Sequence, residues 1–505
     1  SRYSGQIMIS KTTVLRARAF KSGYNGSDTA SQTYVIYTGE STVENHKYTL
    51  PVVSIVTEPG NLWDPETGIY VIGNQYAEVS GQLPTDIRMT AGMNDPNWNL
   101  ANFNAQPKSH PDPLGRSWER DMHFDYIDLD GKTLYSGDGV FQIQGQFSRN
   151  NEQKGFSLKA KGAYGDSVFH YPFFENRSYS DFKSLVLRAS GQDATNSRIR
   201  DNLVTTLFEE GNTGLPENRA VVVQAHKQVV VLLNGKYWGV YDFMERIKED
   251  FIASRFHLSN PDAIDMLFGN GNQYCVLAGN GWEDYTNMVE WAGSHDLSDP
   301  SNYDYINTLM DTENYATYVA AEIIVGNSDS VNLKYWRSSE YDNKWRWILY
   351  DFCWAMNRDD KSSDTATVGF RRDFFSRYFN PEGHGSGKAG STVLIRALLA
   401  NATFKQMFLE KVALMLNDVY TPEKILAMVD RLQGNIDAEM KYDVDLWDSI
   451  TYSFWQQHCD HIRNYAKNYQ EYALKYVQSY FSLSDSEMNS IFGRKTTLED
   501  TTNGG

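Results

Sequence analysis

Two carboxylates and a carboxamide lie between residues 321 and 360, and together they have the chemistry of a cation site. Asp329 and Asn332 stand on a polar loop after the apolar run 320–325, and Asp351 ends a second apolar stretch, KWRWILY. Carboxylate and amide oxygens bind hard cations such as Mg²⁺. A cation held by such a corner, meaning Asp329, Asn332 and Asp351 together, commonly binds nucleotide phosphates. These residues therefore suggest phosphoryl transfer.

Two short strands are expected to hold this corner together. Residues 334–337 and 344–350 have strand-like patterns, and the polar turn 338–343 joins them. Alternation places Trp345 and Trp347 on one face of the second strand, where an indole beside a metal carboxylate could stack on adenine. The alternative is structural, because polar loop residues also cap helices and an aromatic strand also forms core.

Several segments resemble one known protein family. They are SLVLRASGQDATNSRIRDNL (residues 184–203), VVVLLNGKYWGVYDFMERIKEDFI (residues 229–252), and the shorter NSDSVN and WILYDFCWA. Together they resemble the CotH family of spore-coat-protein-H-like secreted kinases, from about residue 50 to residue 483, and NGKYWGVYDFMERI is the most specific piece. The resemblance implies an atypical protein-kinase-like fold and transfer of the γ-phosphoryl of ATP to serines of secreted or coat proteins with a divalent cation.

The resemblance also assigns roles to the residues of the corner. Asp329 would be the catalytic acid that orients or deprotonates the acceptor hydroxyl, and Asn332 and Asp351 would hold Mg²⁺ or Mn²⁺. The chain departs from the family at Cys353, where a second acidic residue is common. The interval from Asp329 to Asn332 is also shorter than in ordinary kinases. If the missing carboxylate binds metal in the family, this chain is a weak kinase or a pseudokinase.

A hairpin in residues 139–165 is the candidate phosphate cover. Gly145 allows a phosphate to approach the backbone closely, and Arg149 can donate two hydrogen bonds to phosphate oxygens. Lys159 can reach a phosphate as a point charge. Lys154 competes with Lys159 for that role. No GxGxxG or Walker sequence supports the assignment, so an exposed hairpin with solvated cations is the alternative.

Glu245 is the candidate partner for the phosphate-binding lysine. Asn234 and Gly235 predict a type I′ turn between two strands, and Glu245 ends the second strand just before the predicted helix 246–256. An ion-pairing Glu holds such a lysine in kinases. A capping or surface role for Glu245 is the alternative. Upstream, the pattern predicts a strand at 184–188 and a helix at 193–210.

Composition limits the class of protein. A chain of 505 residues with 41% apolar content can bury a large core, and we predict two lobes in an α+β fold with a helical C-terminal region. A net charge of −17 repels phosphate backbones and anionic lipid, so nucleic acid and membrane surfaces are not expected partners. No apolar run approaches the roughly 20 residues of a membrane span. Three cysteines are too few for a disulfide framework or a zinc cluster.

The first 39 residues form a separate pattern. ISKTTVLRARAFKSGYNGSDTASQTYVIY reads as two strands around a turn and resembles the β-sandwich module at the C-terminus of chitobiase and hexosaminidase enzymes. This length cannot close a sandwich, so we expect a partial module, either in an extracellular, glycan-associated setting or as a plain spacer. The chain has neither an initiator Met nor a leader, and we expect a trimmed form, which leaves export open.

We therefore expect three parts: a partial β-sandwich at 1–39, a CotH-like kinase domain at 48–483 and a tail at 484–505. Residues 91–118 and 357–390 have the composition of a lid and of an activation or substrate loop. The expected function is that of a secreted or cell-surface Ser/Thr protein kinase acting on an extracytoplasmic protein with ATP and Mg²⁺ or Mn²⁺.

Other functions are weaker alternatives. A pseudokinase, or a cell-surface adhesin that binds a protein or glycan, is the main one. No GxSxG, HExxH or CxxC pattern supports a serine hydrolase, a metalloprotease or a zinc site. A glycosidase needs only two suitably spaced carboxylates, so the sequence leaves that class open.

Overall fold

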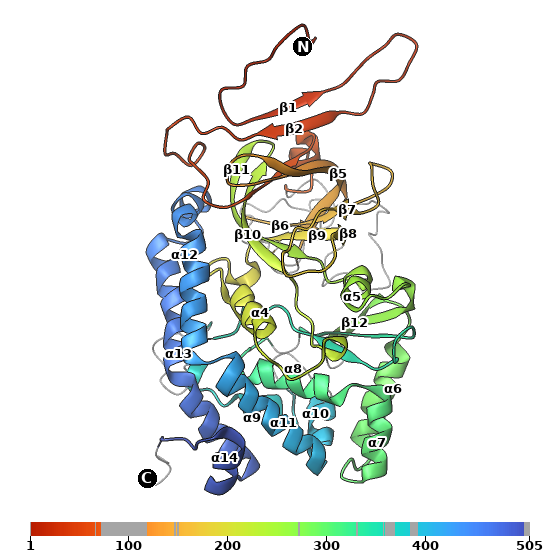
Figure 1. The fold of residues 1–505 in the computed structure, drawn as a ribbon, viewed down its shortest axis with the longest axis vertical. Helices are drawn as coiled ribbons and strands as arrows, with labels where there is room; N and C mark the ends of the chain where they lie inside the picture. The colour runs from red at the N-terminus through yellow and green to blue at the C-terminus, as the bar shows by residue number, and fades with distance from the viewer. Residues whose placement is uncertain are drawn as a thin grey trace, which may run out of the picture. The chain divides into compact units, whose positions relative to one another are not determined.

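The computed structural model describes residues 2–65, 67–71, 119–145, 148, 151–270, 273–329, 332–356, 358, 369–383 and 392–498. The chain divides into two compact units. Unit 1 contains residues 1–194, 225–246 and 434–452, and unit 2 contains residues 195–224, 247–433 and 453–505. Helices and sheets are mixed, which confirms the predicted α+β class (Figure 1).

Seven strands of unit 1 form a closed barrel in the order β10-β11-β9-β6-β5-β4-β3. Their bounds are β3 (Val52–Val56), β4 (Arg120–Ile127), β5 (Thr133–Gln144), β6 (Gly155–Lys159), β9 (Ser184–Arg188), β10 (His226–Leu233) and β11 (Lys236–Glu245). All neighbours are antiparallel except β3 and β10, whose parallel pairing closes the barrel. Closure leaves no open edge in this sheet for another strand to extend.

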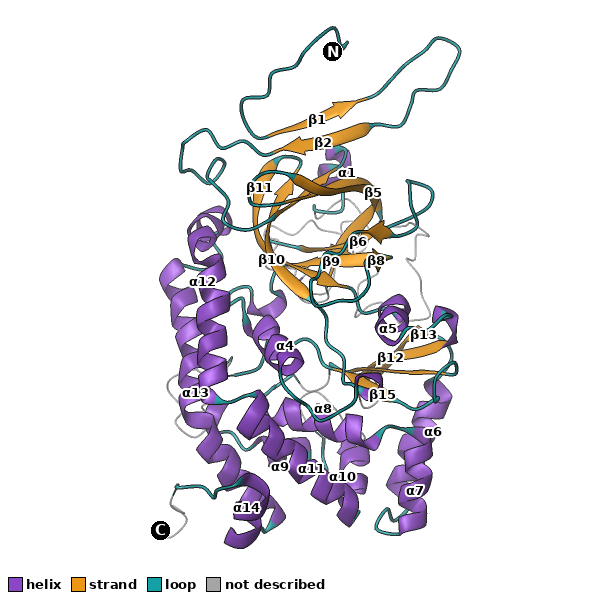
Figure 2. Ribbon diagram, viewed as in Figure 1, coloured by secondary structure: helices purple, strands orange, loops and turns teal. Residues whose placement is uncertain are grey.

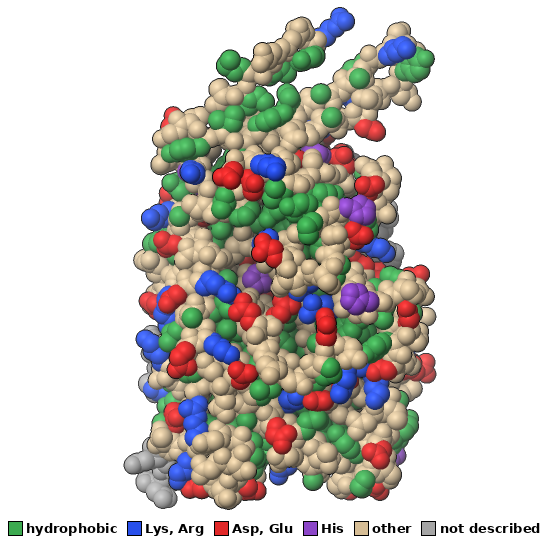
Figure 3. Space-filling model, in the orientation of Figure 1, with side chains coloured by type: hydrophobic (Ala, Val, Ile, Leu, Met, Phe, Trp, Pro, Cys, Tyr) green, Lys and Arg blue, Asp and Glu red, His purple; other side chains and the backbone are tan. Residues whose placement is uncertain are grey.

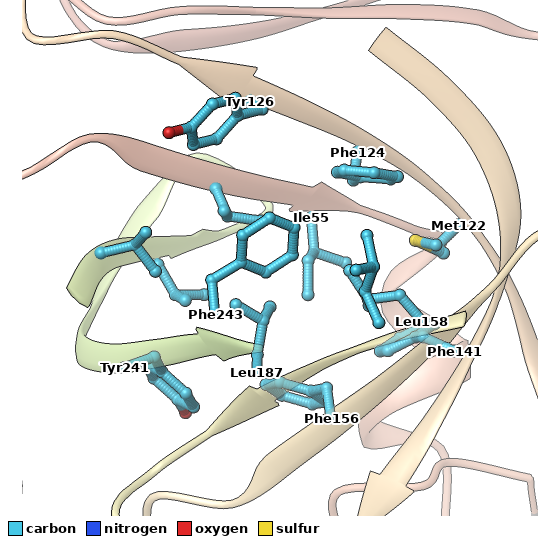
Figure 4. Packing of buried hydrophobic residues seen from close by; sticks show 14 of the residues in the cluster. Ile55, Met122, Phe124, Tyr126, Phe141, Phe156, Leu158, Leu187, Tyr241 and Phe243 are labelled. Atoms are coloured by element: carbon cyan, nitrogen blue, oxygen red, sulfur yellow. The ribbon is translucent and has the colours of Figure 1, made fainter. Parts of the chain in front are cut away.

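The barrel interior is filled by large apolar side chains, as Figure 4 shows for Ile55, Phe124, Phe156, Leu187 and Phe243. All five are completely buried. They come from different strands, because every second residue of a barrel strand points inward. The interior is therefore a packed core and not a ligand cavity.

The N-terminal residues form the predicted two strands, β1 (Thr13–Ala17) and β2 (Ala30–Tyr34), which pair antiparallel. Thr33 anchors the hairpin, since its backbone N–H donates to Asp125 Oδ2 (2.8 Å) and its hydroxyl donates to Ser54 Oγ (2.8 Å). Among the described residues of this segment no third strand joins the pair. The resemblance to a β-sandwich module stays a prediction.

The rest of unit 1 consists of short elements and the end of a long helix. The short elements are α1 (Pro59–Trp63), β7 (Phe169–His170) and β8 (Asp181–Phe182). The helix is α12 (Pro422–Trp447), and two buried carboxylates fasten its last turns to the barrel. Asp443 Oδ2 accepts from the N–H of Val240 (2.7 Å), and Glu439 Oε1 accepts from the N–H of Thr49 (2.6 Å).

Unit 2 contains a four-stranded antiparallel sheet in the order β13-β12-β14-β15, drawn near α5 and α6 in Figure 2. The strands are β12 (Ile264–Asn270), β13 (Gln273–Ala278), β14 (Lys334–Ser338) and β15 (Arg346–Ile348). Helix α5 (Glu249–Phe256) packs on the face that carries Met266 and Trp336. Tyr335 and Trp347 point to the opposite face, where they meet rings of α6 (Trp282–Ser294) and α8 (Thr312–Ile324). The predicted strand pair around the turn is thereby confirmed.

The remaining helices of unit 2 are α4 (Arg200–Glu210), α7 (Pro300–Leu309), α9 (Phe374–Tyr378), α10 (Val393–Leu399), α11 (Ala402–Leu414), α13 (Tyr452–Phe481) and α14 (Asp485–Phe492). The predicted helical C-terminal region is confirmed. Helix α4 begins at Arg200 and not at 193 as predicted. Arg198, which lies between the predicted and the observed start, has a positive φ of 63°, and a right-handed α-helix does not accommodate that conformation.

The described part of the chain contains no helix that is both long and apolar enough to cross a membrane. On the face drawn in Figure 3, acidic and basic side chains are interspersed and form no extended basic patch.

Candidate functional site

The end of helix α8 positions the loop that carries Asp329. Gly326 has φ +62°, and its N–H donates to the carbonyl of Ile323 (3.1 Å), while the N–H of Asn327 donates to the carbonyl of Glu322 (3.1 Å). This pair of bonds is the Schellman motif, which uses a glycine at the left-handed position. The motif fixes the direction in which the chain leaves the helix. Asp329 follows directly.

The second carboxylate, Asp351, lies just after β15 in a constrained backbone. Its φ is +65°, a conformation that costs a non-glycine residue of the order of 1 kcal/mol or more and that persists only when its surroundings impose it. Asp201 and Arg200 of α4 supply that constraint: Asp201 Oδ1 accepts from the N–H of Phe352 (3.0 Å), and Arg200 Nε donates to the carbonyl of Ala355 (3.0 Å). Helix α4 therefore holds both ends of the segment that follows Asp351.

Backbone contacts join the two loops into one structure. The N–H and the hydroxyl of Ser328 both donate to the carbonyl of Trp354, at 3.3 and 3.0 Å. The N–H of Met356 donates to the carbonyl of Val325 (2.9 Å). The residues that flank Asp329 and Asp351 in sequence are therefore bonded to each other.

Asn332 connects the same two loops through its side chain. Its Nδ2 donates to Asp351 Oδ2, and its Oδ1 accepts from the hydroxyl of Tyr350 (2.9 Å). The ammonium of Lys334 lies 3.9 Å from the centroid of the Tyr350 ring, a cation–π contact. The structure thus places Asn332 against Asp351, which were predicted to share a cation.

Asp329 and Asp351 affect each other electrostatically. Burial and, after it, the negative charge of Asp351 raise the pKa of Asp329 from 3.8 to about 6, while Arg377 opposes the rise. Arg377 also holds the loop, because its Nη2 donates to the carbonyl of Ser328 (2.8 Å). A carboxylate whose pKa is raised by burial and by a neighbouring carboxylate marks a place that a cation would stabilise.

The oxygen ligands present fit a nucleotide-bound Mg²⁺ or Mn²⁺ better than an ion held by protein alone. Among the residues that the structure describes, no group of three or more His, Cys, Asp and Glu side chains could hold a metal ion. Mg²⁺ in phosphoryl-transfer sites is bound by one or two carboxylates and completed by phosphate oxygens and water. Asp351 and Asn332, with Asp329 beside them, match that smaller set.

The residues predicted to contact nucleotide phosphates lie in unit 1. Arg149 is outside the described residues. Lys159 forms an ion pair with Glu119 and donates to Gln142 Oε1 (3.1 Å). Its competitor Lys154 is completely buried, and its ammonium donates to the carbonyl of Asn151 (3.2 Å). The phosphate-binding role of Arg149 and Lys159 stays a prediction.

The Glu245 carboxylate is engaged by three donors. It accepts from Arg177 Nε (2.8 Å), from the N–H of Ala225 (2.7 Å) and from the hydroxyl of Tyr179. Glu245 is therefore a buried ion-pairing residue and not an exposed one. Pairing with a phosphate-binding lysine stays a prediction.

Trp345 occupies the core position that was the alternative to adenine stacking. Its side chain is only 1% exposed, with its ring 5.2 Å from that of Tyr285 and the guanidinium of Arg337 over it at 4.9 Å. A ring covered in this way has no open face for a base. We therefore do not propose that Trp345 stacks on adenine.

Other residues at the site were not found from the sequence. They are Asp201, Glu322, Asn327, Arg377 and Tyr378, which hydrogen-bond to the two loops or to each other. No spacing motif connects them, because most lie far from Asp329 in sequence. One usable signal existed: a glycine directly after an apolar helical run predicts the turn that brings Asn327 back to Glu322.

Comparison with known proteins identifies a family. A family model described as CotH kinase protein matches residues 141–473, which is more than half of the chain and includes every residue of the corner. No curated protein matches the sequence. The chain belongs to the CotH kinase family.

Proposed function

We propose that this kinase-like protein transfers the γ-phosphoryl of ATP to a Ser or Thr hydroxyl of an extracytoplasmic protein, with Mg²⁺ or Mn²⁺. Family membership supports a kinase-like protein in general. The observation that carries the finer proposal is the contact of Asn332 with Asp351, together with Asp329, whose pKa is raised by burial and then by the charge of Asp351. A secreted or cell-surface location is part of the same proposal.

Asp329 is the proposed base. With a pKa of about 6 it is ionised at neutral pH, yet it binds a proton more strongly than an ordinary aspartate. It would accept the proton of the acceptor hydroxyl or orient that hydroxyl. When bound, ATP supplies the phosphoryl group and the cation neutralises charge on the phosphates.

Asp351 and Asn332 are the proposed cation ligands. Asn332 now directs its NH₂ group to Asp351, so cation binding requires a half-turn of the amide that brings Oδ1 to that side. The hydroxyl of Tyr350, which donates to Oδ1 in this structure, can equally accept from Nδ2 after the half-turn. Both orientations of the amide are thus compatible with the surrounding residues. Arg149, Lys159 and Glu245 remain proposed contacts of the nucleotide phosphates.

A pseudokinase is the second candidate, and Cys353 favours it. The position where an acid was expected carries a thiol that is 1% exposed, and a neutral thiol attracts Mg²⁺ very little. Such a protein would bind nucleotide weakly or without turnover. If both the kinase and the pseudokinase proposals fail, the protein is an adhesin without affinity for nucleotides.

The test compares Asp351→Ala with Asp329→Asn. Calorimetry with ATP, with and without Mn²⁺, measures binding, and phosphate incorporation into a generic acceptor measures transfer. Asp351→Ala should abolish metal-dependent ATP binding. Asp329→Asn should leave affinity within a few-fold and lower turnover by roughly 10² or more, because a base acts mainly in the transition state.

Each wild-type result selects one candidate. Binding with transfer supports the kinase, binding without transfer supports the pseudokinase, and neither supports the adhesin. Metal-dependent binding that persists in Asp351→Ala would remove Asp351 from the proposed cation site.

A further inference from the structure

Asn327 connects the backbone of Asp329 to the interior of unit 2. Its Oδ1 accepts from the N–H of Asp329 (3.1 Å), and its Nδ2 donates to Glu322 Oε2 (2.8 Å). Asn327 and Glu322 are each only 2% exposed. A buried amide that uses both of its ends in this way cannot rotate without breaking two hydrogen bonds.

Glu322 is itself fixed by aromatic hydroxyls. The hydroxyl of Tyr378 in α9 donates to Glu322 Oε2 (3.0 Å) and lies 3.3 Å from the carbonyl of Asn327. Tyr318, one turn earlier in α8, also hydrogen-bonds to this carboxyl. The network therefore joins α8, the Asp329 loop and α9, and it has a defined orientation.

The proposed cation ligands are held by other groups. Asn332 is held by Tyr350, and the segment after Asp351 is held by Asp201 and Arg200. None of these bonds involves Glu322, Asn327 or Tyr378. A change in the network should therefore move Asp329 without removing a cation ligand.

We propose that Glu322, Asn327 and Tyr378 are positioning residues that set the place of the Asp329 carboxylate for phosphoryl transfer. The inference rests on the proposed function. It adds a division of roles: the network of Glu322, Asn327 and Tyr378 determines the rate of turnover, and the contacts of α4 determine the affinity for the cation.

The first experiment uses Asn327→Ala, which removes the acceptor for the N–H of Asp329. Displacement of a reacting group by about 1 Å can cost 10²-fold in rate, so we expect kcat to fall roughly 10- to 100-fold while Mn²⁺–ATP affinity stays within a few-fold. Hydrogen exchange at the amide of Asp329 should accelerate, and this readout needs no ligand. Equal losses in affinity and turnover would contradict the proposed division.

A matched control separates positioning from general loss of stability. Tyr335 in β14 is completely buried, and its hydroxyl donates to the carbonyl of Gly269 in β12 (3.3 Å), a residue outside the network. Tyr335→Phe removes one buried hydroxyl, as Tyr378→Phe does, and should leave turnover and exchange at Asp329 unchanged. Tyr378→Phe should reduce turnover and accelerate that exchange.

Glu322 offers a conservative comparison that remains useful if Asn327→Ala fails to fold. Glu322→Gln keeps an acceptor for Asn327 and Tyr378, whereas Glu322→Leu removes the acceptor that both side chains share, so the Gln variant should retain more turnover per folded molecule. Wild-type protein that transfers no phosphate overturns the proposed function and, with it, this role. Wild-type protein that transfers phosphate, with variants that match its rate, overturns the positioning role alone.

Discussion

Cys353 is a buried residue two positions after Asp351, at the place where the family resemblance leads us to expect an acid. The segment around it is held from both sides, by Asp201 at Phe352 and by Arg200 at Ala355. A side chain introduced at position 353 therefore enters a fixed environment. Its chemistry can be changed there with little freedom for the backbone to compensate.

Cys353→Asp should make stability depend on metal. Without a cation the new carboxylate is buried where the wild-type side chain is a thiol, so the variant should unfold at a lower temperature than wild type in EDTA. With millimolar Mg²⁺ and ATP, a third hard oxygen ligand should recover much of that loss and raise Mg²⁺ affinity. Thermal unfolding in the two buffers checks this expectation.

Cys353→Ser is the control, because it changes polarity without adding charge. Its unfolding temperature should respond to Mg²⁺–ATP as the wild type does. A Cys353→Asp variant whose deficit is the same in both buffers would show that position 353 does not face the cation.

Elements with strong local signals were predicted well. Strand β9 has the predicted bounds, and the Asn234–Gly235 turn has the two positive φ angles, 51° and 79°, that a type I′ turn requires. The start of α4 was predicted too early. The segment before it contains Ser, Gly, Asp, Thr and Asn, which favour loops. In the structure this preference overrides the helical spacing of the apolar residues.

The site was predicted only where residue type alone gives the chemistry. Asp329, Asn332 and Asp351 carry hard oxygens, and their position beside apolar runs brought them together. Tyr378 and Asp201 act through hydrogen bonds across 56 and 151 residues, and no local pattern specifies such contacts. Trp345 illustrates the limit of such patterns. The alternation of side chains places Trp345 and Trp347 on one face of the strand, but it cannot tell whether other residues cover that face.

Gly239 in β11 tests how α12 is fastened to the barrel within unit 1. Its φ is +102°, and an added Cβ would lie 2.4 Å from Asp443 Oδ2 and 2.6 Å from Gln153 Nε2. Gly239→Ala should therefore lower the free energy of unfolding by about 2–4 kcal/mol, through backbone strain and overpacking. Urea denaturation measures the loss.

Gly434 provides the opposite case for the same substitution. It lies inside α12, is exposed, and an added Cβ would meet nothing within 4 Å. Gly434→Ala should stabilise the protein by about 0.5–1 kcal/mol, since alanine loses less backbone entropy in a helix. If Gly239→Ala and Gly434→Ala destabilise the protein equally, close packing around position 239 does not explain why that position needs glycine.

At the scale of the whole molecule, one buried titrating group in each unit lowers stability as pH rises, over a different pH range in each. In unit 1, burial lowers the pKa of His123, but hydrogen bonds and ion pairs with Asp125 and Asp138 outweigh it and raise the pKa from 6.5 to about 9. The stability from His123 is thus complete below pH 6.5 and is lost as pH rises through 9. In unit 2, burial raises the pKa of Glu322 from 4.5 to about 7.

The sign for Glu322 follows from which state releases its proton first. Between pH 4.5 and 7 the unfolded chain has lost this proton and the folded chain still holds it, so rising pH favours unfolding. The effect is complete above pH 7. A difference of one pKa unit corresponds to about 1.4 kcal/mol, so this group costs the folded state roughly 2–3 kcal/mol at pH 8 relative to pH 4.5.

Glu322→Gln should remove this cost, because the amide does not titrate and its Oε1 can still accept from Asn327 and Tyr378. Measured by urea denaturation from pH 5 to 8, the stability of the variant relative to wild type should rise by roughly 2 kcal/mol. His123, whose shift comes from Asp125 and Asp138, contributes equally to both proteins and cancels in the difference. Glu340→Gln is the control: hydrogen bonds from Ser259 and Asn260 lower the pKa of this exposed residue, so it titrates below the range and its difference should stay flat. Parallel curves for wild type and Glu322→Gln would mean that Glu322 is already ionised in the folded protein at pH 5, with its charge balanced by the three donors that surround it.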